Sequence, residues 1–257
     1  MLIGTGLLLL GVAGFLAYVV RGITGGASAI AFNALFGLEV AFGLAGGLTL
    51  LDGIHWVALS DLVTGLVLFV ALRGQIHAEP FLVRFLIVSL PLNVLATLLL
   101  PSVDLWLLTV SLGLTLVGAG GYLVVRRAIG HWDDATLHRR ALPMGAAAGV
   151  LGGLFGMAGP VSVVYLIHAG GTPSQFRARL TFLSVFWGVS RVATLVLSGA
   201  IGASTVGRFA LTLPLVLGGL ALGYRLHPRV SADAFRIGLG IMVAGSGALL
   251  VVRTIAG

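Results

Sequence analysis

The chain alternates long apolar segments with short polar connectors. Most of the apolar segments approach or exceed the roughly 20 residues that a helix needs to cross the hydrocarbon core of a bilayer. We predict eight segments, at about residues 3–36, 42–72, 81–100, 105–125, 141–168, 175–197, 206–224 and 232–253. The pattern therefore predicts an all-α, polytopic integral membrane protein.

Two of these segments are interrupted in the middle by glycine clusters. Residues 21–28 read Arg-Gly-Ile-Thr-Gly-Gly-Ala-Ser, and residues 152–160 read Gly-Gly-Leu-Phe-Gly-Met-Ala-Gly-Pro. Glycine weakens a helix, and Pro160 has no backbone N–H to donate. In a bilayer, non-helical backbone is tolerated only where protein buries it or where it lines a wet cavity. One such break in each half of the chain is typical of a transporter binding site.

The two halves of the chain are related in sequence. Residues 118–126 resemble residues 245–253 at an offset of 127, and the two breaks align at an offset of 131. We infer an internal duplication, with repeats at residues 1–127 and 141–257 and a cytoplasmic connector at residues 128–140.

The basic residues indicate how the repeats are oriented. The chain is 58% hydrophobic and 9% charged, and all fifteen of its basic residues are arginines. If both interrupted segments enter the membrane and leave on the same side, eleven of the thirteen arginines outside the apolar segments share one side. This arrangement fits the positive-inside rule better than eight full crossings do. It leaves three full crossings in each repeat, so the repeats are predicted to be inverted, with both chain termini outside. The expected location is the inner or plasma membrane of a prokaryote.

The breaks are suited to binding a negative ion. If each segment bends at its break, a second half-helix begins near Ser28 or Pro160 with its N-terminus inside the protein. Such an N-terminus offers free N–H groups and about half a positive charge. The substrate-binding residues predicted at the breaks are Thr24, Gly25, Gly26, Ala27, Ser28, Gly156, Met157, Ala158 and Gly159. Three other glycines are interpreted as helix-packing residues: Gly149, Gly218 and Gly219.

Ionisable residues inside the apolar segments are further candidates. Placing the charged side chain of an arginine such as Arg191 at the centre of a membrane costs about 3 kcal/mol or more, so Arg191 needs a negatively charged partner. We predict that Arg191 contacts the substrate; the alternative is an ion pair with Asp52 or Asp61. Both aspartates are candidates for proton coupling, because a buried carboxyl group takes up a proton readily. Arg21 is interpreted as a cap on the carbonyl groups that end the preceding helix.

The two glycine motifs and the run Phe-Arg-Ala-Arg at residues 176–179 resemble the sulfite exporter TauE/SafE family. The resemblance extends over essentially the whole chain, including the repeat; Ala27, Ser28 and Asn33 depart from the pattern that many members have. It implies secondary transport of small anions, often sulfite, sulfonates or other sulfur compounds. By resemblance, Gly25, Gly26, Gly156 and Gly159 would line the substrate site.

The first hypothesis is therefore a secondary transporter of a small anion, such as sulfite or a sulfonate, in the lipid bilayer with H⁺ as coupling ion. The alternatives are a passive anion channel, a cation transporter that uses the aspartates, and an intramembrane enzyme. No motif of an intramembrane enzyme occurs. The chain has no cysteine and no cluster of metal ligands, so we predict neither metal nor cofactor. The net charge of +7 comes mainly from arginines in the connectors between apolar segments, which is typical of membrane topology and does not indicate nucleic-acid binding.

Overall fold

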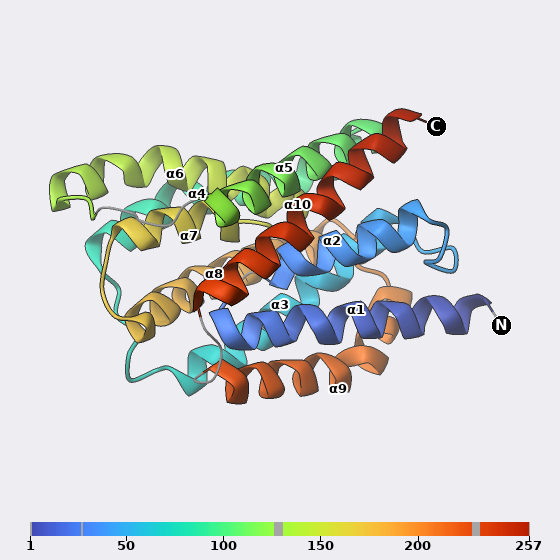
Figure 1. The fold of residues 1–257 in the computed structure, drawn as a ribbon, viewed down its shortest axis with the longest axis horizontal. Helices are drawn as coiled ribbons and strands as arrows, with labels where there is room; N and C mark the ends of the chain where they lie inside the picture. The colour runs from blue at the N-terminus through green and yellow to red at the C-terminus, as the bar shows by residue number, and fades with distance from the viewer. Residues whose placement is uncertain (1, 27, 126–130, 228–231, 257) are drawn as a thin grey trace.

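The computed structural model describes residues 2–26, 28–125, 131–227 and 232–256. Within these residues the chain forms helices and no strand, which confirms the predicted all-α class (Figure 1). The elements are α1 (Leu2–Thr24), α2 (Ser28–Ala41), α3 (Leu50–Ala71), α4 (Pro80–Leu99), the 3-10 turn η1 (Leu100–Ser102), α5 (Leu105–Val125), α6 (Asp134–Phe155), α7 (Gly159–His168), α8 (Pro173–Leu197), α9 (Ala203–Leu226) and α10 (Ala232–Ala256).

Helix α6 begins earlier than the apolar pattern indicated. The predicted segment started at residue 141, whereas the helix starts at Asp134 and includes Arg139 and Arg140. Leu137 and Ala141, one helical turn apart, are both buried in the core. This buried pair extends the packed face of the helix into a stretch that is polar on its other faces.

Both interrupted segments turn back on themselves as hairpins. A Cβ atom on Gly6, near the start of α1, would lie 2.5 Å from the carbonyl oxygen of Ala45, just after α2. In the second hairpin the N–H of Trp132, before α6, donates to the carbonyl oxygen of His168 at the end of α7 (2.9 Å). Each segment therefore ends beside the place where it began.

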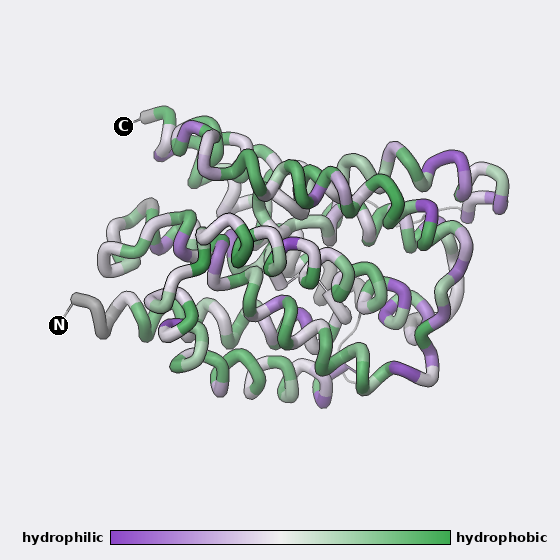
Figure 2. The backbone as a smooth tube through the Cα atoms, turned by 180° about the vertical axis from the view of Figure 1, so that it is seen from behind, coloured by the Kyte–Doolittle hydropathy of each residue, from purple (hydrophilic) through white to green (hydrophobic). Residues whose placement is uncertain are grey.

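The chain termini lie together at one end of the helix bundle, which we call the terminal side, and we call the opposite end the far side (Figure 1). Helix α1 starts at the terminal side, whereas α6 starts at the far side. Hydrophobic residues run along most of the helices, and hydrophilic residues gather mainly at the far side (Figure 2). The two hairpins therefore enter the bundle from opposite ends.

Helices pack in corresponding pairs in the two halves of the chain. Most pairs remain neighbours when each helix is replaced by its counterpart from the other half. The pair α1–α9 corresponds to α6–α4, the pair α3–α9 to α8–α4, and the pair α2–α3 to α7–α8. The pairs α3–α8 and α5–α10 join equivalent helices across the two halves. This is the packing that a duplicated chain predicts. One pair departs from it: α2 packs along α10, whereas α7 has no comparable packing with α5 among the described residues.

Six helices of the described chain are long and apolar enough to cross a membrane, at 6–24, 50–71, 80–102, 105–125, 174–197 and 203–226. The two return limbs, α2 and α7, are shorter apolar helices. Many large apolar side chains are exposed along the helices, as expected for a protein surrounded by lipid. The chain is a multi-pass membrane protein.

Small residues allow several helices to pack closely. A Cβ atom on Gly219 of α9 would overlap the carbonyl oxygen of Phe15 on α1, and one on Gly149 of α6 would overlap that of Ser89 on α4. The interpretation of these two glycines as packing residues is confirmed by the contacts. Gly218 differs, because a Cβ atom there would meet only the edge of the Phe15 ring, at 3.9 Å.

We expect Gly219→Ala to destabilise the protein by about 1–3 kcal/mol, because α1 and α9 must move apart to admit the methyl group. Gly218→Ala is the matched control on the same helix and should leave stability unchanged or slightly raised, since alanine favours the helix. The thermal midpoint of each purified variant in detergent measures the difference. Equal midpoints for the two variants would contradict the assigned packing.

Candidate functional site

The two breaks have the same local backbone geometry. Gly25 directly follows the last residue of α1; it has φ +82° and donates its N–H to the carbonyl oxygen of Arg21 (2.7 Å). Gly156 directly follows the last residue of α6; it has φ +71° and donates its N–H to the carbonyl oxygen of Gly152 (2.9 Å). Both positive φ values lie in the left-handed region, which favours glycine. The glycines therefore end one half-helix and redirect the chain into the next.

Residues from both breaks line one central cavity. Gly26 and Ser28 contribute from the first break, and residues 156–159 from the second. Helices α3, α4 and α8 complete the wall with Asp61, Asn93 and Arg191, among others. The cavity volume is about 50 Å³, whereas one water needs roughly 10–15 Å³ by the same measure. The space therefore suits a small ion or a few water molecules.

Arg191 brings an uncompensated positive charge to this cavity. Its side chain is buried, with 3% relative exposure, and no carboxylate of the described chain forms an ion pair with it. Its Nη2 group donates a long bond of 3.4 Å to the carbonyl oxygen of Leu154, while Nε and Nη1 have no partner within the described residues. Nη1 lies so close to the position of a Cβ atom on Gly156 that the two would overlap, so the missing side chain at the break makes room for the guanidinium.

The beginning of α7 lies against the same space. Gly159 and Val161 are the first residues of this helix with an N–H group, because Pro160 between them has none. Such N–H groups have no partner within their own helix, and they carry the positive end of the helix dipole. Arg191 and the start of α7 thus present positive potential to one side of the cavity.

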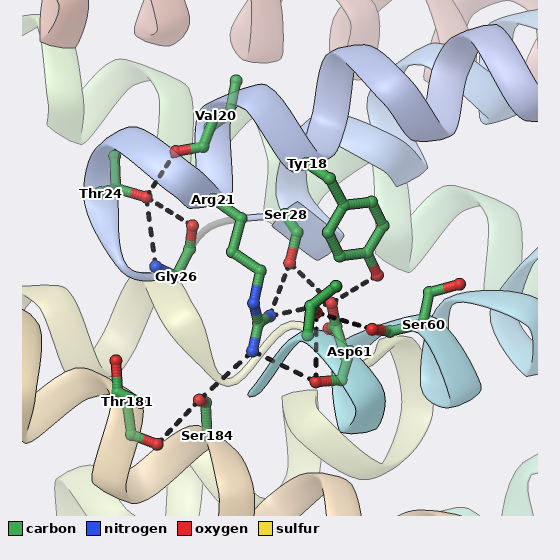
Figure 3. Close-up of polar contacts among 11 residues, drawn as sticks. Tyr18, Val20, Arg21, Thr24, Gly26, Ser28, Ser60, Asp61, Thr181 and Ser184 are labelled. Carbon is green, nitrogen blue, oxygen red and sulfur yellow. Dashed lines mark hydrogen bonds and ion pairs between the residues drawn. The ribbon is translucent and has the colours of Figure 1, made fainter. Parts of the chain in front are cut away.

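The cavity wall also holds a network around Asp61 (Figure 3). Arg21 of α1, with 2% relative exposure, forms an ion pair with Asp61 Oδ1 through Nη1 at 2.9 Å. The same carboxylate oxygen accepts hydrogen bonds from the hydroxyl groups of Tyr18 (2.7 Å) and Ser28 (2.6 Å). Arg21 Nη1 also donates to Ser28 Oγ at 2.8 Å. The network therefore ties both limbs of the first hairpin to α3.

Three predicted site residues lie off the cavity wall or outside the described residues. The Thr24 hydroxyl donates to the carbonyl oxygen of Val20 and accepts from the N–H of Gly26, so it shapes the turn (Figure 3). Gly25 faces Arg177 of α8, whose side chain fills the space above it. Ala27 lies outside the described residues. The remaining break residues, Gly26, Ser28 and residues 156–159, all line the cavity.

Asp52 lies apart from the cavity, near the start of α3. Its carboxylate forms a capping box with Thr49 and an ion pair of 2.7 Å with Arg208 of α9. Its side chain is 28% exposed, so it is not the deeply buried carboxyl group that the sequence indicated. The structure therefore brings Asp61 to the cavity and leaves Asp52 in a peripheral ion pair.

The sequence of this chain is similar to that of a known protein family. A model of the sulfite exporter TauE/SafE family matches residues 10–250. The chain belongs to the sulfite exporter TauE/SafE family. No curated protein and no solved structure shows a significant match. Membership implies a membrane transporter of sulfur-containing anions.

In this TauE/SafE protein, the role of Arg21 differs from the one inferred from the sequence, and the alternative ion-pair role of Arg191 is excluded among the described residues. The interpretation of Arg21 as a helix cap is wrong: the guanidinium pairs with Asp61, and Arg177 donates to the carbonyl oxygen of Gly22 (2.9 Å) instead. Asp61 is therefore not the ion-pair partner of Arg191. Both intramembrane charges were visible in the sequence, but their pairing depends on which helices are neighbours.

Two asparagines that were not predicted as site residues lie at the second break or at the cavity. Asn33 of α2 donates to the carbonyl oxygen of Phe155 (2.8 Å), the last residue of α6, and so links the first hairpin to the second break. Asn93 of α4 is fully buried and lines the cavity. A polar amide inside an apolar segment was the available signal for both residues.

We expect Gly156→Ala to abolish ligand binding in this TauE/SafE protein, because the methyl group would displace the Arg191 guanidinium. Gly199→Ala is the matched control: Gly199 also has a positive φ (+71°), but its Cβ position has no atom within 4 Å. Both variants should lose roughly 1–2 kcal/mol from the left-handed backbone. We expect sulfite to raise the thermal midpoint of the native protein and of Gly199→Ala but not that of Gly156→Ala; a full rise in Gly156→Ala would contradict the assignment.

Proposed function

We propose that the protein is a secondary transporter of a small sulfur-containing oxyanion, such as sulfite or a small sulfonate, bound in the central cavity. The observation that carries the proposal is the buried Arg191 guanidinium, which has two unpartnered N–H groups at the second break. A buried cation without a partner is costly, and an anion supplies the missing charge and hydrogen-bond acceptors.

The proposed ligands are arranged around that guanidinium. Arg191 would bind the anion together with the free N–H groups at the start of α7, where Gly156, Met157, Ala158 and Gly159 form the wall. Gly26 and Ser28 would close the cavity from the first break. Thr24 and Gly25 would act indirectly, by holding the turn that places Gly26 and Ser28.

Proton coupling is proposed for Asp61 alone. Its carboxyl group lies in the same cavity as the proposed anion and is 18% exposed, so a proton can reach it through the cavity. An anion and a carboxylate repel each other at short range, and protonation of the acid removes that repulsion. Asp52 contacts Arg208 and Thr49 and does not line this cavity.

We also infer that the two repeats are inverted and that the protein resides in the inner membrane. The two hairpins enter from opposite ends of the bundle, and the helices pack in the corresponding pairs expected for a duplication (Figure 1). Among the described residues, arginines lie in the first two turns of α6 and α8 and in the last turn of α9, and hydrophilic residues gather mainly at the far side (Figure 2). The far side would therefore be cytoplasmic and the terminal side external.

We expect Arg191→Ala to weaken sulfite binding by about 30-fold or more, because truncating one member of a buried charge pair costs about 2–5 kcal/mol. Arg208→Ala is the control, since Arg208 is also an arginine in a helix but pairs with Asp52 away from the cavity. Titration of each purified variant with sulfite measures the difference. Native affinity in Arg191→Ala would make this arginine structural and would overturn the proposed site.

We expect Asp61→Asn to abolish uphill uptake of sulfite driven by a pH gradient in proteoliposomes, because asparagine cannot take up and release the coupled proton. Exchange of labelled for unlabelled sulfite should persist, since the anion contacts remain. Asp52→Asn is the matched control and should retain uptake driven by the gradient. Flux that stays linear with concentration and ignores the gradient in the native protein would instead identify a passive channel.

A further inference from the structure

The charged groups around the central cavity are not balanced. Arg21, Asp61 and Arg191 are the charged residues that line it within the described chain, so the ionised walls carry one net positive charge. A bound monovalent anion would neutralise this charge with Asp61 ionised. A divalent anion would leave one excess negative charge, which a proton on Asp61 would remove. Charges buried in an apolar interior are tolerated when they are compensated.

Only one atom of each side chain takes part in the ion pair between Arg21 and Asp61. Nη1 contacts Oδ1 at 2.9 Å, while the bonds from Nη2 to the Asp61 carbonyl oxygen and to Ser184 Oγ are both 3.3 Å long. Arg21 Nε has no partner in the described chain. The pair of Arg179 with Glu79 at the far side is different, because two nitrogens contact two oxygens at 2.6 and 2.8 Å. The contact between Arg21 and the Asp61 carboxylate is therefore a one-point contact rather than a two-point one, and Arg21 Nε retains an N–H group for a ligand.

Asp61 can remain hydrogen-bonded if Arg21 turns away from it. Oδ1 keeps the hydroxyl groups of Tyr18 from α1 and Ser28 from α2 (Figure 3). Oδ2 accepts no hydrogen bond within the described residues, so it is available for a proton. The other charged group facing Asp61 is Arg191 of α8, across the cavity. Asp61 therefore keeps two hydrogen-bond donors on Oδ1 and a free Oδ2 if Arg21 turns to a ligand.

We propose that the cavity takes up a divalent oxyanion together with one proton, and that Arg21 passes from Asp61 to the anion as it binds. The proposal rests on the proposed function and specifies the charge of its substrate. In this step the contact between Nη1 and Oδ1 breaks, Arg21 donates to an anion oxygen, and a proton from solvent binds Asp61 Oδ2. The loaded cavity then holds two guanidinium groups, a neutral acid and a dianion, and its net charge is zero. The anion and the proton therefore travel in the same direction.

Calorimetric titration of the full-length protein in lipid nanodiscs tests this coupling. Titrations repeated in buffers of different ionisation enthalpy count the protons taken up with each anion. Sulfate and thiosulfate are the divalent probes, and methanesulfonate is the monovalent probe. We expect about one proton per bound divalent anion and almost none with methanesulfonate, as linkage of the two equilibria requires.

Three variants separate the roles of the residues. Asp61→Asn mimics the protonated acid, so it should bind the divalent anions without proton uptake. The double variant Arg21→Gln with Asp61→Asn leaves no unpaired charge from the ion pair; it should bind divalent anions about tenfold more weakly or worse and bind methanesulfonate normally. Arg208→Gln should behave as the native protein, because it lies outside the cavity.

The inference is overturned if the native protein binds divalent anions without proton uptake, or if the double variant keeps native affinity for them. Either result would leave the dependence of binding on Arg191 intact, and with it the proposed function. Binding of both classes of anion that is unaffected by Arg191→Ala would overturn the proposed site itself. A native protein that binds neither class would overturn both proposals.

Discussion

A buried guanidinium that forms no ion pair with a carboxylate of the described residues is the feature on which the candidate site depends. Arg191 lies in the last third of α8, inside an apolar span long enough to cross a membrane, and an unbalanced charge at the centre of a membrane costs about 3 kcal/mol or more. The fold tolerates this cost at the point where Gly156 leaves space and where α7 begins. In a site that only held the helices together, Asp61 could have balanced the charge, yet Asp61 is occupied by Arg21.

The protein satisfies the carbonyl pole of each break and leaves the N–H pole of the second break open to the cavity. Each break joins the carbonyl end of one helix to the N–H end of the next. Side chains from other helices reach the carbonyl ends: Arg177 contacts Gly22 at the end of α1, and Asn33 contacts Phe155 at the end of α6. The N–H end of α7 faces the cavity instead. This asymmetry favours an anion over a cation as the ligand, because the groups that would bind a cation are already engaged.

The sequence was sufficient to predict the helices, the two breaks and Arg191, because each leaves a local signal. Glycine clusters inside apolar segments and an arginine far from any connector can be read without knowing which helices are neighbours. The partners of Arg21 and Asp61 could not be predicted, since they lie forty residues apart on helices whose packing is a tertiary property. The difference between Gly218 and Gly219 has the same origin: adjacent glycines look alike in sequence, but only Gly219 faces α1 closely enough for a side chain to clash with its backbone.

Helix α8 contacts both breaks. Arg177 packs against Gly25 and Arg191 against Gly156, although these two arginines are fourteen residues apart, or about 21 Å along a helix axis. Residues of both breaks nevertheless line one cavity, together with Arg191 itself. A movement of either hairpin against α8 would therefore change the cavity wall. The shape of the ligand site depends on how the two hairpins pack against this one helix.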